Sequence, residues 1–178
     1  MLKTVRITSA DSPLYASFQE ACAASFPDNE RRSDAAQRAA LRDPRYRLDA
    51  WLDSGRFIAF MGWWDFEAFR YIEHVAVAPQ ARSGGYGKSI LTQWLGASTR
   101  PVLLEIEEVV DDLTRRRLGF YERLGFKQTP GAHRQPPYQG GGPAPVMQTL
   151  SWPEPVSEKE RQDFVALLHS DVWSSLSG

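Results

Sequence analysis

The chain has 178 residues, enough for one well-buried domain, and its 42% apolar and 24% charged residues are typical of a globular protein. A formal net charge of −1 argues against a nucleic-acid-binding surface, and no apolar run approaches the roughly 20 residues that span a bilayer. The single Cys22 and a start without a signal-like apolar stretch predict a cytoplasmic protein. We therefore expect one domain over residues 1–178, with neither nucleic acid nor a membrane as partner.

The first part of the chain predicts a strand followed by two helices. Residues 4–8 alternate with β-branched side chains, which is typical of a strand. Ser12 followed by Pro13 favours a helix start, because the hydroxyl can cap the helix and proline fits its first turn. Residues 30–41 are rich in Ala and Arg and predict a second helix with a thin apolar face.

The middle of the chain predicts three strands, at residues 46–52, 56–64 and 69–77. Residues 53–55 and 65–67 contain turn-forming Asp, Ser and Gly between these strands. Because the connections are this short, the three strands should form an antiparallel meander.

Helices and strands then alternate to the end of the sheet. The expected elements are a helix at 87–96, a strand at 102–106, a helix at 112–124, and strands at 126–129 and 146–152. The helix at 87–96 connects strand 69–77 to strand 102–106, and a helical connection implies that these two strands run parallel. The pattern predicts an α/β (α+β) fold with a mixed, mostly antiparallel central sheet of about 6–7 strands flanked by helices.

Two further segments complete the domain. Residues 130–145 are rich in Pro and Gly, and either a floppy surface loop or a lid over the substrate fits this composition. A C-terminal helix is expected over residues 157–174, because Ser157 and Glu160 have the spacing of a capping box.

The segment from residue 75 to residue 90 contains the motif that is most informative about function. A strand ends, glycines follow, and a helix opens directly after them. Unpaired N–H groups at a helix start attract anions, and glycines let the backbone approach a phosphate. Arg82, Lys88 and Ser89 add side-chain donors. The segment therefore predicts a phosphate-binding turn.

Three phosphate motifs compete for this turn. Residues 87–89 fit the end of a P-loop, but Arg82 stands where its first glycine belongs. A dinucleotide-binding turn would follow the first strand of a parallel sheet, whereas this one follows an antiparallel meander. The third pattern, Arg/Gln-x-x-Gly-x-Gly/Ala, fits residues 82–87 at every position. A tight turn without a ligand remains the alternative.

The third pattern is the acyl-CoA signature of the GNAT superfamily of N-acetyltransferases, which this chain resembles. The strand at 71–79 and the helix end at 120–126 are also similar to the family's segments, and the resemblance covers about residues 45–130. It implies transfer of an acetyl group from acetyl-CoA, as co-substrate and without a metal, to a primary amine that attacks the thioester directly. A CoA-binding domain without turnover is the alternative.

The resemblance also implies which residues hold CoA. Backbone groups of Val75, Ala76 and Val77 would pair with the pantetheine arm. The pyrophosphate would rest on the turn and helix start, at Arg82, Ser83, Gly84, Gly85, Tyr86, Gly87, Lys88 and Ser89. Thr114 stands where relatives often place a CoA-contacting Asn, and Arg117 stands where a small residue is usual.

Amide formation requires a neutral amine, so a base is expected near the thioester. Glu73 is the first choice, with a half-buried ion-paired carboxylate as its alternative, and Glu105 or Glu107 could serve instead. Strand alternation should point His74 to the face opposite Glu73, and we interpret it as structural. The resemblance implies Tyr121 as general acid, with a packing aromatic as the alternative.

Acidic residues on both sides of the expected site predict a small cationic amine as acceptor. Beside Glu73, they are Glu105, Glu107, Glu108, Asp111 and Asp112. An ordinary solvated acidic loop is the alternative, and Trp63, Trp64 and Tyr138 are candidate aromatic walls. The three histidines lack metal-ligand spacing, so no metal is expected, and a homodimer is left open.

Overall fold

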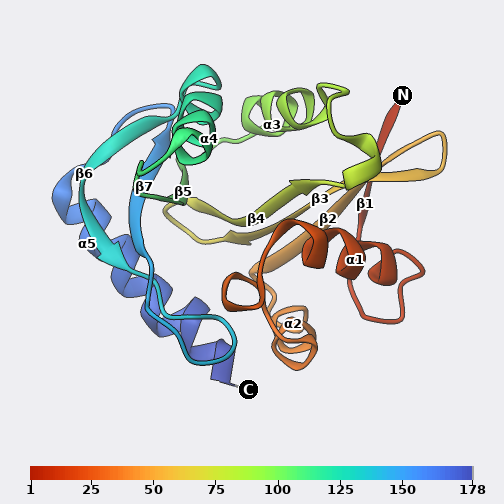
Figure 1. The fold of residues 1–178 in the computed structure, drawn as a ribbon, viewed down its shortest axis with the longest axis horizontal. Coiled ribbons are helices and arrows are strands. Elements are labelled where there is room, and N and C mark those ends of the chain that lie inside the picture. Colours follow the sequence, from red (N-terminus) through yellow and green to blue (C-terminus); the bar gives the residue numbers. More distant parts are fainter. Residues whose placement is uncertain (178) are drawn as a thin grey trace.

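The protein is described from a computed structural model that covers residues 1–177, and Figure 1 shows its seven-stranded sheet in the order β1-β2-β3-β4-β5-β7-β6. The strands are β1 (Leu2–Arg6), β2 (Tyr46–Asp53), β3 (Arg56–Asp65), β4 (Arg70–Val77), β5 (Val102–Glu107), β6 (Lys127–Arg134) and β7 (Val146–Trp152). The α-helices are α1 (Tyr15–Ser25), α2 (Asp34–Ala40), α3 (Tyr86–Gly96), α4 (Asp112–Arg123) and α5 (Glu158–Leu167). Among these strands only β4 and β5 pair in parallel, so the predicted fold class is confirmed.

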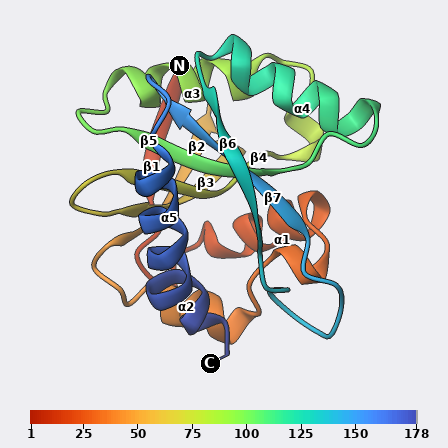
Figure 2. The ribbon, with the colours of Figure 1, turned by 90° about the vertical axis from the view of Figure 1, so that its left-hand side faces the viewer.

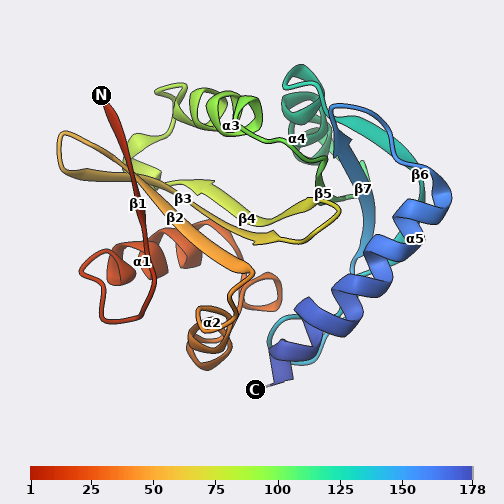
Figure 3. The same cartoon turned by 180° about the vertical axis from the view of Figure 1, so that it is seen from behind.

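Helices cover both faces of the sheet. Figures 1 and 3 show α3 and α4 on one face and α1 and α2 on the other. Figure 2 shows α5 running beside β6 and β7, and its Phe164 packs on Tyr71 and Phe69 with ring centroids 5.4 Å apart. Each face has its own apolar core, one around Phe60, Trp64 and Phe164 and the other around Met61, Ile90 and Leu150.

Several boundaries differ from the sequence-based expectation. The second helix does not begin at residue 30: a short 3-10 turn spans Asp28–Glu30, and α2 starts after Ser33, whose hydroxyl accepts a hydrogen bond from the Ala36 N–H at 3.1 Å. β6 runs through Pro130 and Gly131, where a register shift against β7 accommodates both. The expected loop therefore shortens to residues 135–145.

The C-terminal helical run extends about as far as expected but changes its geometry. The α-helix α5 ends at Leu167, a π turn follows over Leu168–Val172, and a 3-10 turn occupies Trp173–Ser177. The predicted capping box is present, because the Ser157 hydroxyl accepts from the Glu160 N–H and the Glu160 carboxylate accepts from the Ser157 N–H.

The central feature of the sheet is the divergence of β4 and β5. Their parallel pairing covers only Arg70–Ile72 against Val102–Leu104. Beyond Leu104, β5 pairs with β7 alone, and β4 beyond Ile72 pairs with β3 alone. One edge of β4 therefore presents backbone N–H and C=O groups without a strand partner, which another extended molecule can bind.

A β-bulge in β4 lies at the start of this divergence. In the register with β3, Gly62 faces His74 and Trp63 faces Ile72, so Glu73 has no opposite residue. A Cβ on Gly62 would collide with the Tyr46 hydroxyl, so a side chain there would require Tyr46 to shift. Because of the bulge, Glu73 and His74 both contact Tyr138 on the α1 side of the sheet. The expectation that His74 points to the opposite face is wrong.

Candidate active site

The divergence of β4 and β5 opens a cavity of about 240 Å³. It is lined by residues 72–77 of β4, residues 104–106 of β5, Ser25 and Phe26 at the end of α1, Arg82, and Arg117 and Tyr121 of α4. A smaller cavity of about 70 Å³ adjoins it and extends toward Gln135 and Met147. The fold therefore brings Glu73, Glu105 and Tyr121, predicted from separate segments of the sequence, to the wall of one cavity.

The glycine-rich turn follows β4 directly and leads into α3. Gly85 precedes the helix with a φ of 72°, and no side chain caps the helix start. The N–H groups of the first turn therefore have no intrahelical acceptor. A Cβ on Gly87 would contact Val77 at 3.5 Å and Phe120 at 3.8 Å, while Lys88 and Ser89 are exposed. This geometry suits an anion lying against the backbone.

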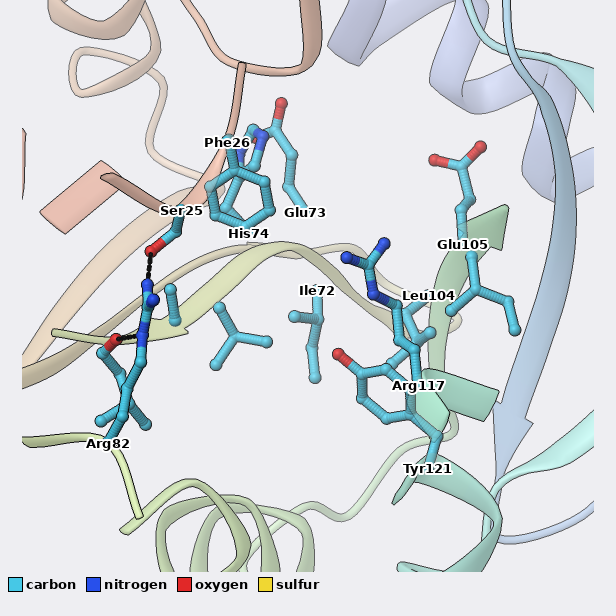
Figure 4. Close-up of a pocket in the computed structure, with 14 residues that line it drawn as sticks. Ser25, Phe26, Ile72, Glu73, His74, Arg82, Leu104, Glu105, Arg117 and Tyr121 are labelled. Atoms are coloured by element: carbon cyan, nitrogen blue, oxygen red, sulfur yellow. Dashed lines mark hydrogen bonds between the residues drawn. The ribbon is translucent and has the colours of Figure 1, made fainter. Parts of the chain in front are cut away.

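Arg82 does not point toward the turn as the sequence suggested. Its Nε donates to the Val77 carbonyl at 3.3 Å, and its Nη2 donates to the Ser25 hydroxyl at 3.1 Å. Figure 4 shows this side chain bridging β4 and the end of α1. In this arrangement the Arg82 side chain forms a wall of the cavity, and only its backbone lies in the glycine-rich turn.

The two α4 side chains enter the cavity from the other side. In Figure 4 the Tyr121 hydroxyl and the Arg117 guanidinium both point toward the space between β4 and β5. Burial raises the pKa of Tyr121 to about 12, although the nearby Arg117 charge opposes the shift. The phenol is therefore protonated at neutral pH and can donate a hydrogen bond.

Thr114 is occupied elsewhere. Its hydroxyl accepts from the backbone N–H groups of Val110 and Asp111, at 3.0 and 3.1 Å, and donates to the Asp111 carboxylate at 2.8 Å. The Thr114 N–H in turn donates to the Asp111 carboxylate, which completes a capping box at the start of α4. The residue that replaces the family's Asn thus stabilises a helix end and has no free donor for CoA.

Glu73 lies in a buried ion pair. Its carboxylate is 2.9 Å from the Arg32 guanidinium, with side chains 0% and 1% exposed. It also accepts hydrogen bonds from Trp64 Nε1 at 3.0 Å and from the Tyr138 hydroxyl at 2.9 Å. Burial favours the neutral acid, but Arg32, His74 and these hydrogen bonds outweigh it, so the pKa of Glu73 is lowered. A carboxylate stabilised in this way is a weak base.

Glu105 is also fully engaged. The Tyr71 hydroxyl donates to one carboxylate oxygen at 2.6 Å, and His133 Nε2 lies 2.5 Å from the other. The carboxylate side chain is 3% exposed. As expected from strand alternation, Glu105 and Ile106 lie on opposite faces of β5, because Glu105 bonds to Tyr71 of the α1-side core while Ile106 belongs to the apolar core of the other face.

The smaller cavity carries an acidic edge. Glu30, from the short turn before α2, faces Glu107 there. Burial raises the pKa of Glu30 to about 7, together with a hydrogen bond and repulsion from Glu107 and against the opposing charge of Arg117. Near neutral pH Glu30 therefore loses its proton as the pH rises, and the negative charge of this edge increases.

The loop at 135–145 is anchored over the site. The Tyr138 N–H donates to the Asn29 carbonyl at 2.8 Å, the Gln139 side chain donates to the Arg31 carbonyl at 2.8 Å, and Tyr138 is only 4% exposed. Trp64 lies behind Glu73, whereas Trp63 packs against Trp94 on the other face. Of the three candidate aromatic walls, Tyr138 therefore packs on His74, which lines the cavity.

Sequence reasoning missed the contributions of Glu30, Arg32 and His133. Arg32 sits in an Ala- and Arg-rich segment that reads as a solvated helix, and His133 lies in a segment that reads as a loop. Sequence spacing does not indicate these contacts, because the partner of Arg32 lies 41 residues away and the partner of His133 lies 28 residues away. In the described part of the chain, no helix could cross a membrane and no group of three or more metal-binding side chains is present.

Comparisons with known proteins agree with this geometry. The sequence model of the acetyltransferase (GNAT) domain matches residues 48–128. A solved acetyltransferase of the GNAT family from Bacteroides thetaiotaomicron is 32% identical, with a TM-score of 0.89, and the match covers 96% of this chain and 98% of that one. No curated protein matches the sequence.

More distant structures share the fold. The ribosomal-protein-S18-alanine N-acetyltransferase from Escherichia coli is 16% identical, with a TM-score of 0.62 over 89% of this chain and 97% of that one. An aminoglycoside 6′-N-acetyltransferase solved with coenzyme A is 13% identical, with a TM-score of 0.61 over 88% of this chain and 99% of that one. At these identities the likeness concerns the fold alone.

The buried ion pair leads to a stability prediction. Arg32→Met should lower the free energy of unfolding by about 3–5 kcal/mol, because it leaves the Glu73 carboxylate buried without its partner. Arg38→Met is the matched control: its ion pair with Asp34 is exposed to solvent, so its loss should cost far less. Urea unfolding measures both, and adding Glu73→Gln to Arg32→Met should restore part of the loss. Equal costs for the two Arg variants would contradict the structural role of the pair.

Proposed function

Because the chain belongs to the GNAT family of acetyltransferases, we propose that it transfers an acetyl group from acetyl-CoA to a primary amine by direct attack on the thioester. The observation that carries this proposal is the divergence of β4 and β5, which opens a cavity beside an uncapped, glycine-rich helix start. An extended molecule could lie along the free edge of β4, and a pyrophosphate attached to it could bind at the start of α3.

CoA would occupy both features at once. Its pantetheine arm would lie along the unpaired edge of β4 at Val75, Ala76 and Val77, and its pyrophosphate would bind the backbone N–H groups of residues 82–88. Lys88 and Ser89 are exposed in the first turn and add donors there. Thr114 does not contribute, since its hydroxyl is committed to the helix cap.

The thioester would then lie in the 240 Å³ cavity, close to Tyr121. When the amine nitrogen attacks the carbonyl carbon, the C–S bond breaks and a thiolate leaves. The Tyr121 hydroxyl, which remains protonated at neutral pH, can donate a proton to this thiolate and regain one from the attacking nitrogen. Glu73 and Glu105 act in this proposal as structural carboxylates, because both are held by buried partners.

The acceptor is proposed to be a small cationic amine. It would enter from the side of the smaller cavity, where Glu30 and Glu107 meet under the anchored Tyr138 loop. A protonated amine would be attracted by this acidic edge, and the attraction should increase as Glu30 loses its proton near pH 7.

Acetyl-CoA binding is tested with Gly87→Glu. At about 100 times its dissociation constant, acetyl-CoA should stabilise the parent protein by roughly 2.7 kcal/mol, and this thermal shift should vanish in the variant. A glutamate in the first turn of α3 places a negative charge where the pyrophosphate would bind. The helix itself should tolerate the change, because acidic side chains are favourable at helix N-termini. Gly142→Glu makes the same charge change in open space and should keep the shift. If Gly87→Glu binds acetyl-CoA like the parent, CoA does not use this turn.

The role of Tyr121 is tested by turnover. Tyr121→Phe should lower kcat by about 10²-fold or more, because the thiolate loses its proton donor, while acetyl-CoA affinity stays unchanged. Tyr86→Phe is the control: it removes a hydroxyl that donates to Asp53 at 3.0 Å on the protein surface, and it should keep normal kcat. Full activity of Tyr121→Phe would reduce Tyr121 to a packing residue.

The charge of the acceptor is tested with amines of matched size. Each has the same reacting amine and a second group that is cationic, neutral or anionic. The cationic series should have the highest kcat/KM, and Glu107→Gln should reduce this preference while Glu108→Gln, at an exposed position outside the cavity, should leave it intact. A preference for neutral or anionic amines contradicts the proposed acceptor class. Acetyl-CoA binding without turnover on any amine would indicate a CoA-binding domain that has lost catalysis.

A further inference from the structure

We infer that His74, oriented by the backbone carbonyl of Glu30, accepts the proton that the acceptor amine must lose before it attacks the thioester. The inference rests on the proposed N-acetyl transfer and supplies the base that Glu73 and Glu105 cannot provide. It stands on the bulge in β4, which turns His74 to the same side of the sheet as Glu73.

The hydrogen bond of His74 determines its tautomer. Nε2 lies 2.6 Å from the Glu30 carbonyl oxygen, and a carbonyl can only accept, so Nε2 carries the hydrogen. In the neutral ring, Nδ1 therefore holds the lone pair. The structure assigns Nδ1 no hydrogen-bond partner among residues 1–177, and unlike Nδ1 of His133 it is not sealed within protein. It is a free acceptor in a side chain that is 8% exposed.

His74 lies where the cavities of the site meet. Its side chain lines the 240 Å³ cavity proposed for the thioester, the 70 Å³ cavity proposed for the acceptor, and a third cavity of about 110 Å³ between α1 and α2. Figure 4 shows it beside Phe26 and Glu73, across the cavity from Tyr121. A base at this position has access to both substrates.

Aromatic contacts fix the imidazole ring. Phe26 and Tyr138 both meet it edge to face, at centroid distances of 4.8 and 5.5 Å and interplanar angles of 73° and 85°. Together with the Glu30 hydrogen bond, these contacts hold the ring in one orientation. A base whose rotamer is already fixed loses little entropy when the amine binds.

The surroundings keep His74 neutral when the site is empty. Burial lowers the pKa of His74 below 6.5; Glu73 and Glu105 oppose this shift and Arg32 adds to it. The ionisable groups that share its cavities are Tyr15, Cys22, Glu30, Arg31, Arg32, Asp34, Tyr71, Glu73, Arg82, Glu105, Glu107, Arg117 and Tyr121, with Tyr138 against the ring. At neutral pH the imidazole can therefore accept a proton, and the neighbouring Glu73 carboxylate stabilises the imidazolium that results.

Each proton that the acceptor loses in the proposed reaction then has a destination. The ammonium form of the acceptor gives one proton to His74 Nδ1, and its neutral nitrogen attacks the carbonyl carbon. A second proton leaves the nitrogen as the C–S bond breaks and reaches the thiolate by way of Tyr121. The products are the N-acetylated amine and the CoA thiol, and His74 releases its proton to solvent.

His74→Gln separates a chemical role from a structural one. The glutamine amide can still donate to the Glu30 carbonyl, but it cannot accept a proton. We expect kcat/KM to fall by about 10²-fold or more at pH 7, with the acetyl-CoA thermal shift and the unfolding temperature unchanged. His169→Gln, at an exposed histidine, is the matched control and should keep full activity.

The pH profile gives a second readout. At saturating amine, where the effect of Glu30 on binding does not enter, kcat of the parent protein should stop rising once the pH exceeds the pKa of His74, which burial holds below 6.5. In His74→Gln, kcat should keep rising toward the pKa of the amine, about 10. An acceptor amine with a pKa near 7 should lose far less rate in the variant. If His74→Gln keeps the rates and the pH profile of the parent protein, the inference about His74 is overturned and the proposed function is not. Failure of the parent protein to acetylate any amine overturns the proposed function together with it.

Discussion

The active-site region depends on one buried ion pair, between Arg32 and Glu73. Neither side chain is more than 1% exposed, so their charges compensate each other without help from water. Arg32 also donates to the Ser175 hydroxyl and the Val172 carbonyl, and Glu73 accepts from Trp64 and Tyr138. The pair thereby connects the segment before α2, the bulge of β4, the loop at 135–145 and the C-terminal turns. Of these segments, the bulge and the loop contribute residues that line the two adjoining cavities.

The bulge at Glu73 divides two tasks between neighbouring residues. In a regular strand only one of Glu73 and His74 could face the α1 side. With the bulge both do, and Glu73 supplies fixed negative charge while His74 keeps a free nitrogen beside the cavity. Opposite His74 stands Gly62, whose missing side chain leaves room for the Tyr46 hydroxyl. The irregularity of the strand thus places the proposed base.

The opposite face of the sheet supplies the other half of the site. The uncapped start of α3 offers backbone donors at one end of the cavity, and α4 directs Tyr121 and Arg117 into its middle. The two halves meet only because β4 and β5 stop pairing after Ile72 and Leu104. Divergent strands leave room for a ligand that replaces the missing strand partner, and the proposed binding site therefore lies in the gap of the sheet.

Local patterns in the sequence determined the order and type of most elements, the mixed sheet and the glycine-rich turn before α3. Strand alternation, capping residues and the glycines before α3 act over a few residues, so they can be recognised without a partner segment. Tertiary structure decided the roles of the charged groups. The sequence cannot show that Arg32 reaches Glu73, that Glu105 is held by Tyr71 and His133, or that a bulge turns His74 toward the site. These outcomes depend on burial and on contacts between distant segments, and both exist only after the chain has folded.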